Sequence, residues 1–252
     1  MNEAFLILIA SPSQLILACL VAFSASVLGG LSGYGTSLVL PVFLVPLVGV
    51  TNVIPVMTVA MLLNNSSRVI AFWQDIQWLH VRHILIFGLP TCIAGAYSYT
   101  LLSADWIALL LGTFLLASVP LRRILHKAQF RFSTITELGA GAVLGFINGG
   151  MSGTGVILIS ILMSVGVAGS ALVATDAIIA VTMGAVKIIL FGNFAALNLE
   201  LALTGLLIGL CTTPGAFVAR ILLEHILAGI HAWFMELIVI AGAITLLSRV
   251  HW

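Results

Sequence analysis

Two glycine-rich stretches of the 252-residue chain share one pattern of glycine and serine. The first, GGLSGYG, runs from Gly29 to Gly35, and the second, GGMSGTG, runs from Gly149 to Gly155. Glycine permits positive φ and the close approach of another group, so a helix can break at such a stretch. Apolar residues follow each stretch, and a new helix is expected to start at Thr36 and at Val156.

Paired helix starts are suited to binding an anion. The N-terminus of a helix presents free N–H groups and the positive end of the helix dipole, and serine and threonine hydroxyls are additional donors. If the two breaks face each other, these groups form an anion cradle. The predicted contacts are Ser32, Gly33, Gly35, Thr36, Asn148, Ser152, Gly153 and Thr154, with Arg68 and Lys187 as electrostatic support. The alternative is that the small residues only pack helices closely.

Several charged residues lie inside the apolar segments, where a charge is expensive, and Arg68, Asp176 and Lys187 are the candidates for the site. Arg68 and Lys187 either hold an anion or extend their side chains to the nearest membrane surface. Asp176 lies eleven residues before Lys187, which puts the two on one helix face but too far apart to pair. Asp176 is either a proton carrier in coupled transport or an N-terminal charge that the helix dipole stabilises.

Other chemistry is not predicted. His80 and His83 are three residues apart, but no third ligand lies nearby in the sequence, so no metal site is expected. Cys19, Cys92 and Cys211 are far apart within apolar runs and are interpreted as packing residues. The sequence shows no nucleophile–base pair and no phosphate loop. We therefore expect no enzyme, no cofactor and no metal.

The amino-acid composition indicates that the chain is a membrane protein. Hydrophobic residues make up 62% of the chain and charged residues 7%, and the mean hydropathy is +1.26. A soluble protein carries about 25% charged residues, so the expected surroundings are a lipid bilayer. Apolar runs of about 20 residues predict an all-α integral membrane fold. The net charge of +1 argues against nucleic acid as a partner.

The chain is predicted to contain eight to ten helical segments in two inverted repeats, with broken or re-entrant helices at the glycine motifs. The apolar segments are expected at residues 13–30, 36–48, 53–73, 81–100, 106–125, 136–148, 156–165, 171–191, 199–223 and 227–248. The first repeat is residues 1–125, a basic linker is 126–134, and the second repeat is 135–252. An odd number of segments per repeat inverts the second repeat, a plan common in secondary transporters.

The positive charges predict the orientation in the membrane. Basic residues concentrate in and around the linker, so the linker is placed in the cytoplasm and both termini outside the cell. The expected location is the bacterial inner membrane, with several passes through it. Whether the protein forms a homo-oligomer is left open.

The motifs and the residues that follow them resemble the TauE/SafE sulfite-exporter family, also called the toluene-sulfonate-uptake permease family. The resemblance covers nearly the whole chain and rests on GGLSGYGTSLVLPVF followed by GVTNVIPVMT, and on GAGAVLGFINGGMSGTGVIL followed by VATDAI. In the first half, IPVMT replaces the Ala-Thr element that is common in the family. The resemblance implies export or uptake of small sulfur-containing anions, such as sulfite, sulfoacetate and other organosulfonates.

We therefore predict a secondary transporter that exports such an anion by alternating access. The alternatives are a passive anion channel, a transporter of another small organic anion, and a membrane-embedded enzyme or assembly factor without transport activity. Coupling to protons through Asp176 is an open prediction.

Overall fold

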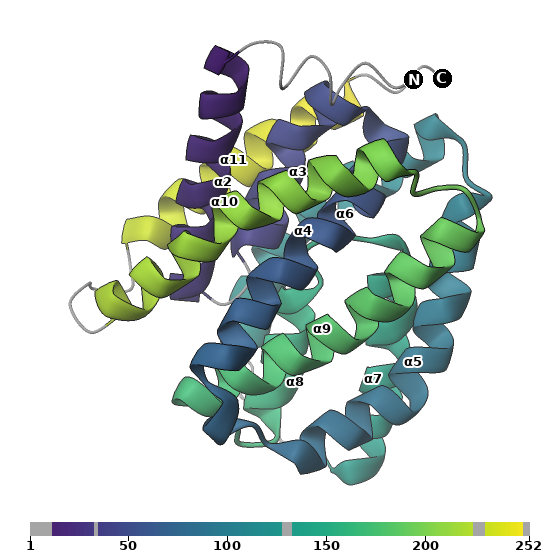
Figure 1. The fold of residues 1–252 in the computed structure, drawn as a ribbon. Coiled ribbons are helices and arrows are strands. Elements are labelled where there is room, and N and C mark those ends of the chain that lie inside the picture. The colour runs from purple at the N-terminus through teal and green to yellow at the C-terminus, as the bar shows by residue number, and fades with distance from the viewer. Residues whose placement is uncertain (1–11, 33–34, 128–132, 224–229, 249–252) are drawn as a thin grey trace.

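The computed structural model describes residues 12–32, 35–127, 133–223 and 230–248. Within these ranges the chain forms α-helices and one short 3₁₀ helix, with no strand (Figure 1). The α-helices are α2 (Pro12–Ser32), α3 (Gly35–Val48), α4 (Val50–Ala71), α5 (Trp78–Thr100), α6 (Ala104–Lys127), α7 (Thr134–Gly150), α8 (Gly155–Ser164), α9 (Gly169–Asn193), α10 (Leu199–Leu223) and α11 (Ile230–Leu247). The 3₁₀ helix η1 (Trp73–Asp75) connects α4 to α5.

The predicted all-α membrane fold is confirmed. Each predicted apolar segment is a helix, and the ends lie within three residues of the predicted ones. In the part of the chain that the structure describes, α4, α5, α9 and the stretch Ala104–Leu121 of α6 are long and apolar enough to cross a membrane. Large apolar side chains such as Ile86 (57%) and Phe87 (50%) are exposed. Contact with lipid explains this exposure, because the surface of a soluble protein rarely carries so many large apolar side chains.

The helices that follow the glycine motifs are too short to cross a bilayer. α3 has 14 residues and α8 has 10. At about 1.5 Å per residue they extend about 21 Å and about 15 Å, less than the hydrocarbon core of about 30 Å. Each short helix is therefore expected to end within the membrane, as broken or re-entrant hairpins require.

The break between α7 and α8 has a defined backbone. Met151 is extended, with φ −130° and ψ 158°, and Gly153 has a positive φ of 89°. A positive φ favours glycine, which explains Gly153 in the second motif. The side-chain nitrogen of Asn148 donates a hydrogen bond to Thr154 Oγ1 across the break, at 2.6 Å. The equivalent break between α2 and α3 includes Gly33 and Tyr34, which lie outside the described residues.

Glycines also bring α5 and α7 together, and these helices lie side by side (Figure 1). Gly141, Gly145 and Gly149 are spaced by four residues on α7, and a Cβ on any of them would collide with a backbone carbonyl of α5. Small residues allow such close approach of membrane helices. The packing role is therefore the correct interpretation for Gly149 in the second motif.

A reciprocal contact joins α2 to α10, where Gly215 lies against Phe23 and Ser26. The first helix of each predicted repeat (α2 or α7) thus packs against the fourth helix of the other (α10 or α5). Two interlocked repeats would pack in this way. The repeat boundaries and the inversion stay predictions.

A disulfide joins α2 to α10. Cys19 and Cys211 are bonded, with their Cα atoms 5.2 Å apart. The prediction that all three cysteines are packing residues is therefore wrong for this pair. The reason is that 192 residues separate them in the sequence, and only the packing of α2 on α10 makes them neighbours. Cys92 is buried and keeps a free thiol.

The buried apolar side chains form two clusters among the described residues. One includes Leu40 and Leu44 of α3 and Ile54 of α4. The other includes Ile84 of α5 and Leu162 of α8. Buried polar side chains are exceptions in such a core and need partners, so they indicate where a site lies.

Candidate functional site: a charged cavity at the helix breaks

A cavity of about 90 Å³ lies where the start of α3 and the junction of α7 and α8 meet α4 and α9. It has room for several water-sized groups. Its lining comes from the start of α3, from α4, from the α7–α8 junction and from α9. The lining residues are Thr36, Ser37, Ile54, Met57, Thr58, Met61, Leu62, Asn64, Asn65, Arg68, Asn148, Met151, Ser152, Gly153, Thr154, Gly155, Asp176, Ala180, Gly184 and Lys187.

The second glycine motif meets the start of α3, the helix that follows the first motif, at this cavity. Ser152 Oγ of the second motif donates a hydrogen bond to the carbonyl oxygen of Ser37, in the first turn of α3, at 2.9 Å. The first residues of α3 and of α8 both line the cavity, including Thr36 and Gly155. Two helix N-termini, each the positive end of a helix dipole, therefore converge on one space.

Three buried charged side chains face the same space. Arg68 of α4 and Asp176 of α9 form an ion pair, with Nη1 3.1 Å from Oδ2, and their side chains are 7% and 4% exposed. Arg68 Nη1 also donates to Asn65 Oδ1 at 3.2 Å. Lys187 Nζ donates to the carbonyl oxygen of Asn148 at 2.8 Å. Two cations and one carboxylate give the cavity one net positive charge when all three are ionised.

This geometry decides between the alternatives for the charged residues. Arg68 and Lys187 are each 6% exposed and line the cavity, so neither extends to a membrane surface. Asp176 lies seven residues after Gly169, the first residue of α9. A helix dipole acts mainly within the first turn, so stabilisation by the dipole is the wrong interpretation of Asp176. Its partner is the guanidinium of Arg68.

The hydroxyl groups hold the cavity walls together. Thr36 Oγ1 donates to the carbonyl oxygen of Ala25 at 3.1 Å, and Ser152 Oγ donates to Ser37. A hydroxyl has one proton to donate, so in this conformation neither proton is directed at a bound anion. The charged donors of the cavity are therefore Arg68 and Lys187, supported by backbone N–H groups at the helix starts.

The structure brings together most of the residues predicted as a site. The predicted residues that line the cavity are Thr36, Arg68, Asn148, Ser152, Gly153, Thr154, Asp176 and Lys187. Gly35 is the first residue of α3, but its contacts lie outside the part of the chain that the structure describes. Gly33 and the side chain of Ser32 lie outside the part of the chain that the structure describes.

Several cavity residues were missed by the sequence analysis. Thr58, Asn64 and Asn65 lie on the same side of α4 as Arg68 and line the cavity. Asn64 Oδ1 accepts a hydrogen bond from Ser26 of α2 at 2.9 Å. The run of two asparagines before Arg68 inside an apolar helix was the available signal, because buried amides need partners.

Long apolar helices around a cavity with buried charges define a class of protein: an all-α membrane protein with an internal polar site. The family model described as "Sulfite exporter TauE/SafE" matches residues 18–246, and the chain belongs to this family. The family resemblance predicted from the motifs is thereby confirmed. The family implies membrane transport of sulfite or related anions. No curated protein and no solved structure matches the chain.

Proposed function

We propose that the protein is a secondary transporter that exports a small sulfur-containing anion, such as sulfite, sulfoacetate or another organosulfonate, by alternating access. The observation that carries this proposal is that the start of α3, the break between α7 and α8 and three buried charges line one cavity. Broken helices that meet at a polar site are the usual plan of secondary transporters.

The cavity chemistry supports an anionic cargo with several oxygen atoms. A sulfite or sulfonate group has three oxygens, which accept several charge-assisted hydrogen bonds at once. Lys187 and Arg68 supply such donors, and the starts of α3 and α8 add positive partial charge. The one net positive charge of the cavity suits a monoanion.

We further propose that Asp176 couples anion binding to a proton. An anion that binds Arg68 competes with the Asp176 carboxylate, which lies 3.1 Å from the guanidinium. A buried carboxylate that loses its counter-charge is unfavourable and takes up a proton instead. Anion and proton would then move together, and net export would follow when the outward gradient of the anion exceeds the inward gradient of protons.

The proposal is tested with the purified full-length protein in liposomes. Initial uptake of radiolabelled sulfite is measured against concentration, with thiosulfate, sulfoacetate, taurine and sulfate as competitors. We expect saturable uptake and counterflow by preloaded anion. Flux that rises without saturation and shows no counterflow would indicate a channel. Absence of flux for labelled sulfite, thiosulfate, sulfoacetate and sulfate, each measured in turn, would contradict the proposed function.

A further inference from the structure

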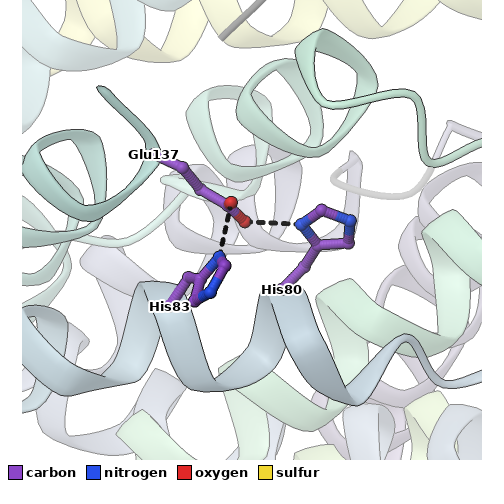
Figure 2. A group of neighbouring side chains, drawn as sticks. All are labelled: His80, His83 and Glu137. Atoms are coloured by element: carbon purple, nitrogen blue, oxygen red, sulfur yellow. Dashed lines mark hydrogen bonds and ion pairs between the residues drawn. The ribbon is translucent and has the colours of Figure 1, made fainter. Parts of the chain in front are cut away.

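A second group of polar side chains lies where α5 and α7 begin, outside the residues that line the cavity (Figure 2). His80 and His83 project from the start of α5, and Glu137 projects from the first turn of α7. His80 Nδ1 lies 2.7 Å from Glu137 Oε1, and His83 Nδ1 lies 2.9 Å from Oε2. No metal site was predicted from the sequence, because no third ligand lies near the two histidines along the chain. In the folded protein Glu137 is a third potential ligand beside them, so that premise is wrong.

The burial of Glu137 makes this group unusual. Its side chain is 2% exposed, whereas the two imidazoles are each 20% exposed. A buried carboxylate is costly unless it is paired, hydrogen-bonded or bound to a metal. Both carboxylate oxygens are occupied by imidazole Nδ1 atoms. One ligand atom from each of the three residues lies within 4.8 Å of the other two.

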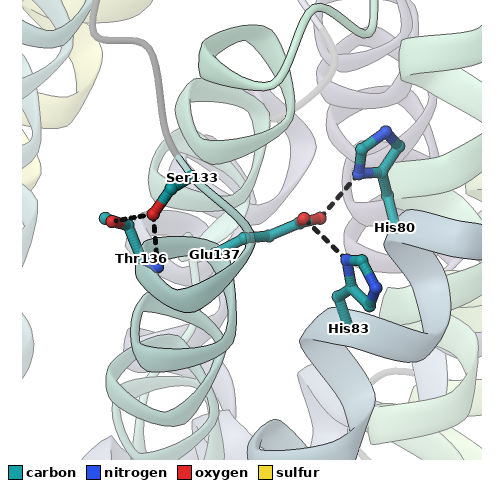
Figure 3. Close-up of polar contacts among 5 residues, drawn as sticks. All are labelled: His80, His83, Ser133, Thr136 and Glu137. Carbon is teal, nitrogen blue, oxygen red and sulfur yellow. Dashed lines mark hydrogen bonds and ion pairs between the residues drawn. The ribbon is translucent and has the colours of Figure 1, made fainter.

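The three side chains are held in place before any ion binds. Ser133 caps α7: its Oγ accepts a hydrogen bond from the N–H of Thr136 (Figure 3). The carbonyl of Ser133 accepts another from the N–H of Glu137. This cap orients the turn that carries Glu137. His80 and His83 are three residues apart, which places them on one face of α5. A preorganised set of donors loses little entropy when it binds an ion.

We propose that His80, His83 and Glu137 bind a divalent transition-metal ion, with Zn²⁺ the best suited. Two imidazole nitrogens and one carboxylate oxygen are a donor set found at zinc sites that keep a fourth position for water. Mg²⁺ and Ca²⁺ prefer oxygen ligands alone, so this set discriminates against them. The partly exposed imidazoles give an ion a path from solvent to the buried carboxylate.

The geometry requires only a small adjustment. Bonds of about 2.0–2.2 Å to a tetrahedral ion separate the ligand atoms by about 3.4 Å. The two Nδ1–oxygen distances of 2.7 and 2.9 Å must therefore widen by about 0.7 and about 0.5 Å, and ligand atoms that lie up to 4.8 Å apart must approach each other. Small rotations of the partly exposed imidazoles can supply this movement. Each neutral imidazole then carries its proton on Nε2, which leaves Nδ1 free to coordinate.

A bound ion would join α5 to α7. These helices already pack closely through Gly141, Gly145 and Gly149, and they belong to the first and second predicted repeats. The ion would hold the N-terminal ends of this helix pair together. Ion binding should therefore stabilise the folded protein as well as occupy the site.

The test uses the full-length protein in detergent after removal of metals with a chelator. Zinc chloride is titrated by calorimetry, and Co²⁺ serves as an absorbance probe of coordination geometry. We expect one Zn²⁺ per chain and a rise in Tm on addition of Zn²⁺. The variant His80→Ala with His83→Ala, and the variant Glu137→Gln, should each lose at least tenfold in affinity. Glu200→Gln, the same change in the first turn of α10, should retain it.

Wild-type protein that binds no Zn²⁺ would overturn the proposal. So would Zn²⁺ binding of equal affinity and equal Tm shift in the histidine variant and the wild type, because the ion would then lie elsewhere. If Glu137→Gln does not fold, the single variant His83→Ala decides the outcome in the same titration, since this side chain is partly exposed.

Discussion

At the scale of residues, the net charge of the cavity is set by Arg68, Asp176 and Lys187. Arg68 and Asp176 neutralise each other across α4 and α9, whereas Lys187 is held by a backbone carbonyl. Removing one member of a buried ion pair costs about 3–5 kcal/mol, because the other charge is left uncompensated. Lys187 can be replaced without leaving a charged partner behind, so it is the sharper probe of anion binding.

Lys187→Met should weaken anion binding at least tenfold while the fold is retained. Methionine keeps much of the apolar stem and removes the ammonium, which supplies charge-assisted hydrogen bonds. The measurement is the concentration dependence of anion uptake in liposomes. Arg82→Gln, which removes an exposed cation of α5 outside the cavity, is the matched control and should behave like the wild type. Equal apparent affinities for both variants would remove Lys187 from the site.

Asp176→Asn should abolish the response of uptake to a pH gradient. The amide keeps the size of the side chain but cannot carry the proton that Asp176 is proposed to bind. Initial uptake is compared with and without acid outside the liposomes, at a temperature below the unfolding midpoint of the variant. Asp105→Asn changes an exposed acid in the first turn of α6 and serves as the control. A full response of Asp176→Asn to the gradient would exclude this residue as the proton carrier.

At the scale of elements, the short helices α3 and α8 begin at the cavity, and the glycine face of α7 holds one of its walls against α5. α3 and α8 are short helices, and the first turn of each lies beside the cavity. α7 carries the second break at one end and packs on α5 along its length through three glycines. Displacing α7 would therefore move Asn148, which binds both Lys187 and Thr154.

Gly145→Ala should destabilise the protein, whereas Gly139→Ala should not. A Cβ on Gly145 would collide with the carbonyl of Gly88, and such overpacking costs about 1–3 kcal/mol. A Cβ on Gly139 of the same helix meets nothing within 4 Å. Both changes raise helix propensity equally, so the comparison isolates packing. Thermal unfolding in detergent measures the difference, and equal Tm values would contradict the close contact of α5 with α7.

At the scale of the whole molecule, the helices interlock across the two predicted repeats. α5 packs on α7, α2 on α10, and α4 on α9, so neither half forms its contacts alone (Figure 1). The disulfide between Cys19 and Cys211 adds a covalent link between α2 and α10. The predicted orientation places the turn after α5 outside the cell and the start of α7 in the cytoplasm.

Single cysteines at two exposed positions test this orientation. In a background without native cysteines, Ser103→Cys, just before α6, should react with a membrane-impermeant thiol reagent in intact cells. Ser133→Cys, at the N-cap of α7, should react only in inverted vesicles. The reverse labelling pattern would show that the whole protein is oriented the other way. Labelling of both positions from one side would contradict the predicted crossing by α6.

The sequence by itself determined the helices and eight of the twenty residues that line the cavity. Apolar runs and glycine breaks are local signals, so the bounds of each helix could be predicted from the residues in it. The repetition of the glycine motif also indicated that both breaks belong to one site. Ser152 and Ser37 meet across 115 residues, as that interpretation requires.

Only the tertiary structure decided which distant residues become partners. It paired Arg68 with Asp176, brought Glu137 to His80 and His83, and joined two cysteines 192 residues apart. Such partners depend on which helix faces meet and how closely they approach. In a membrane, hydrophobicity does not select those faces, because lipid is as apolar as the helices, and small residues and buried polar groups select them instead.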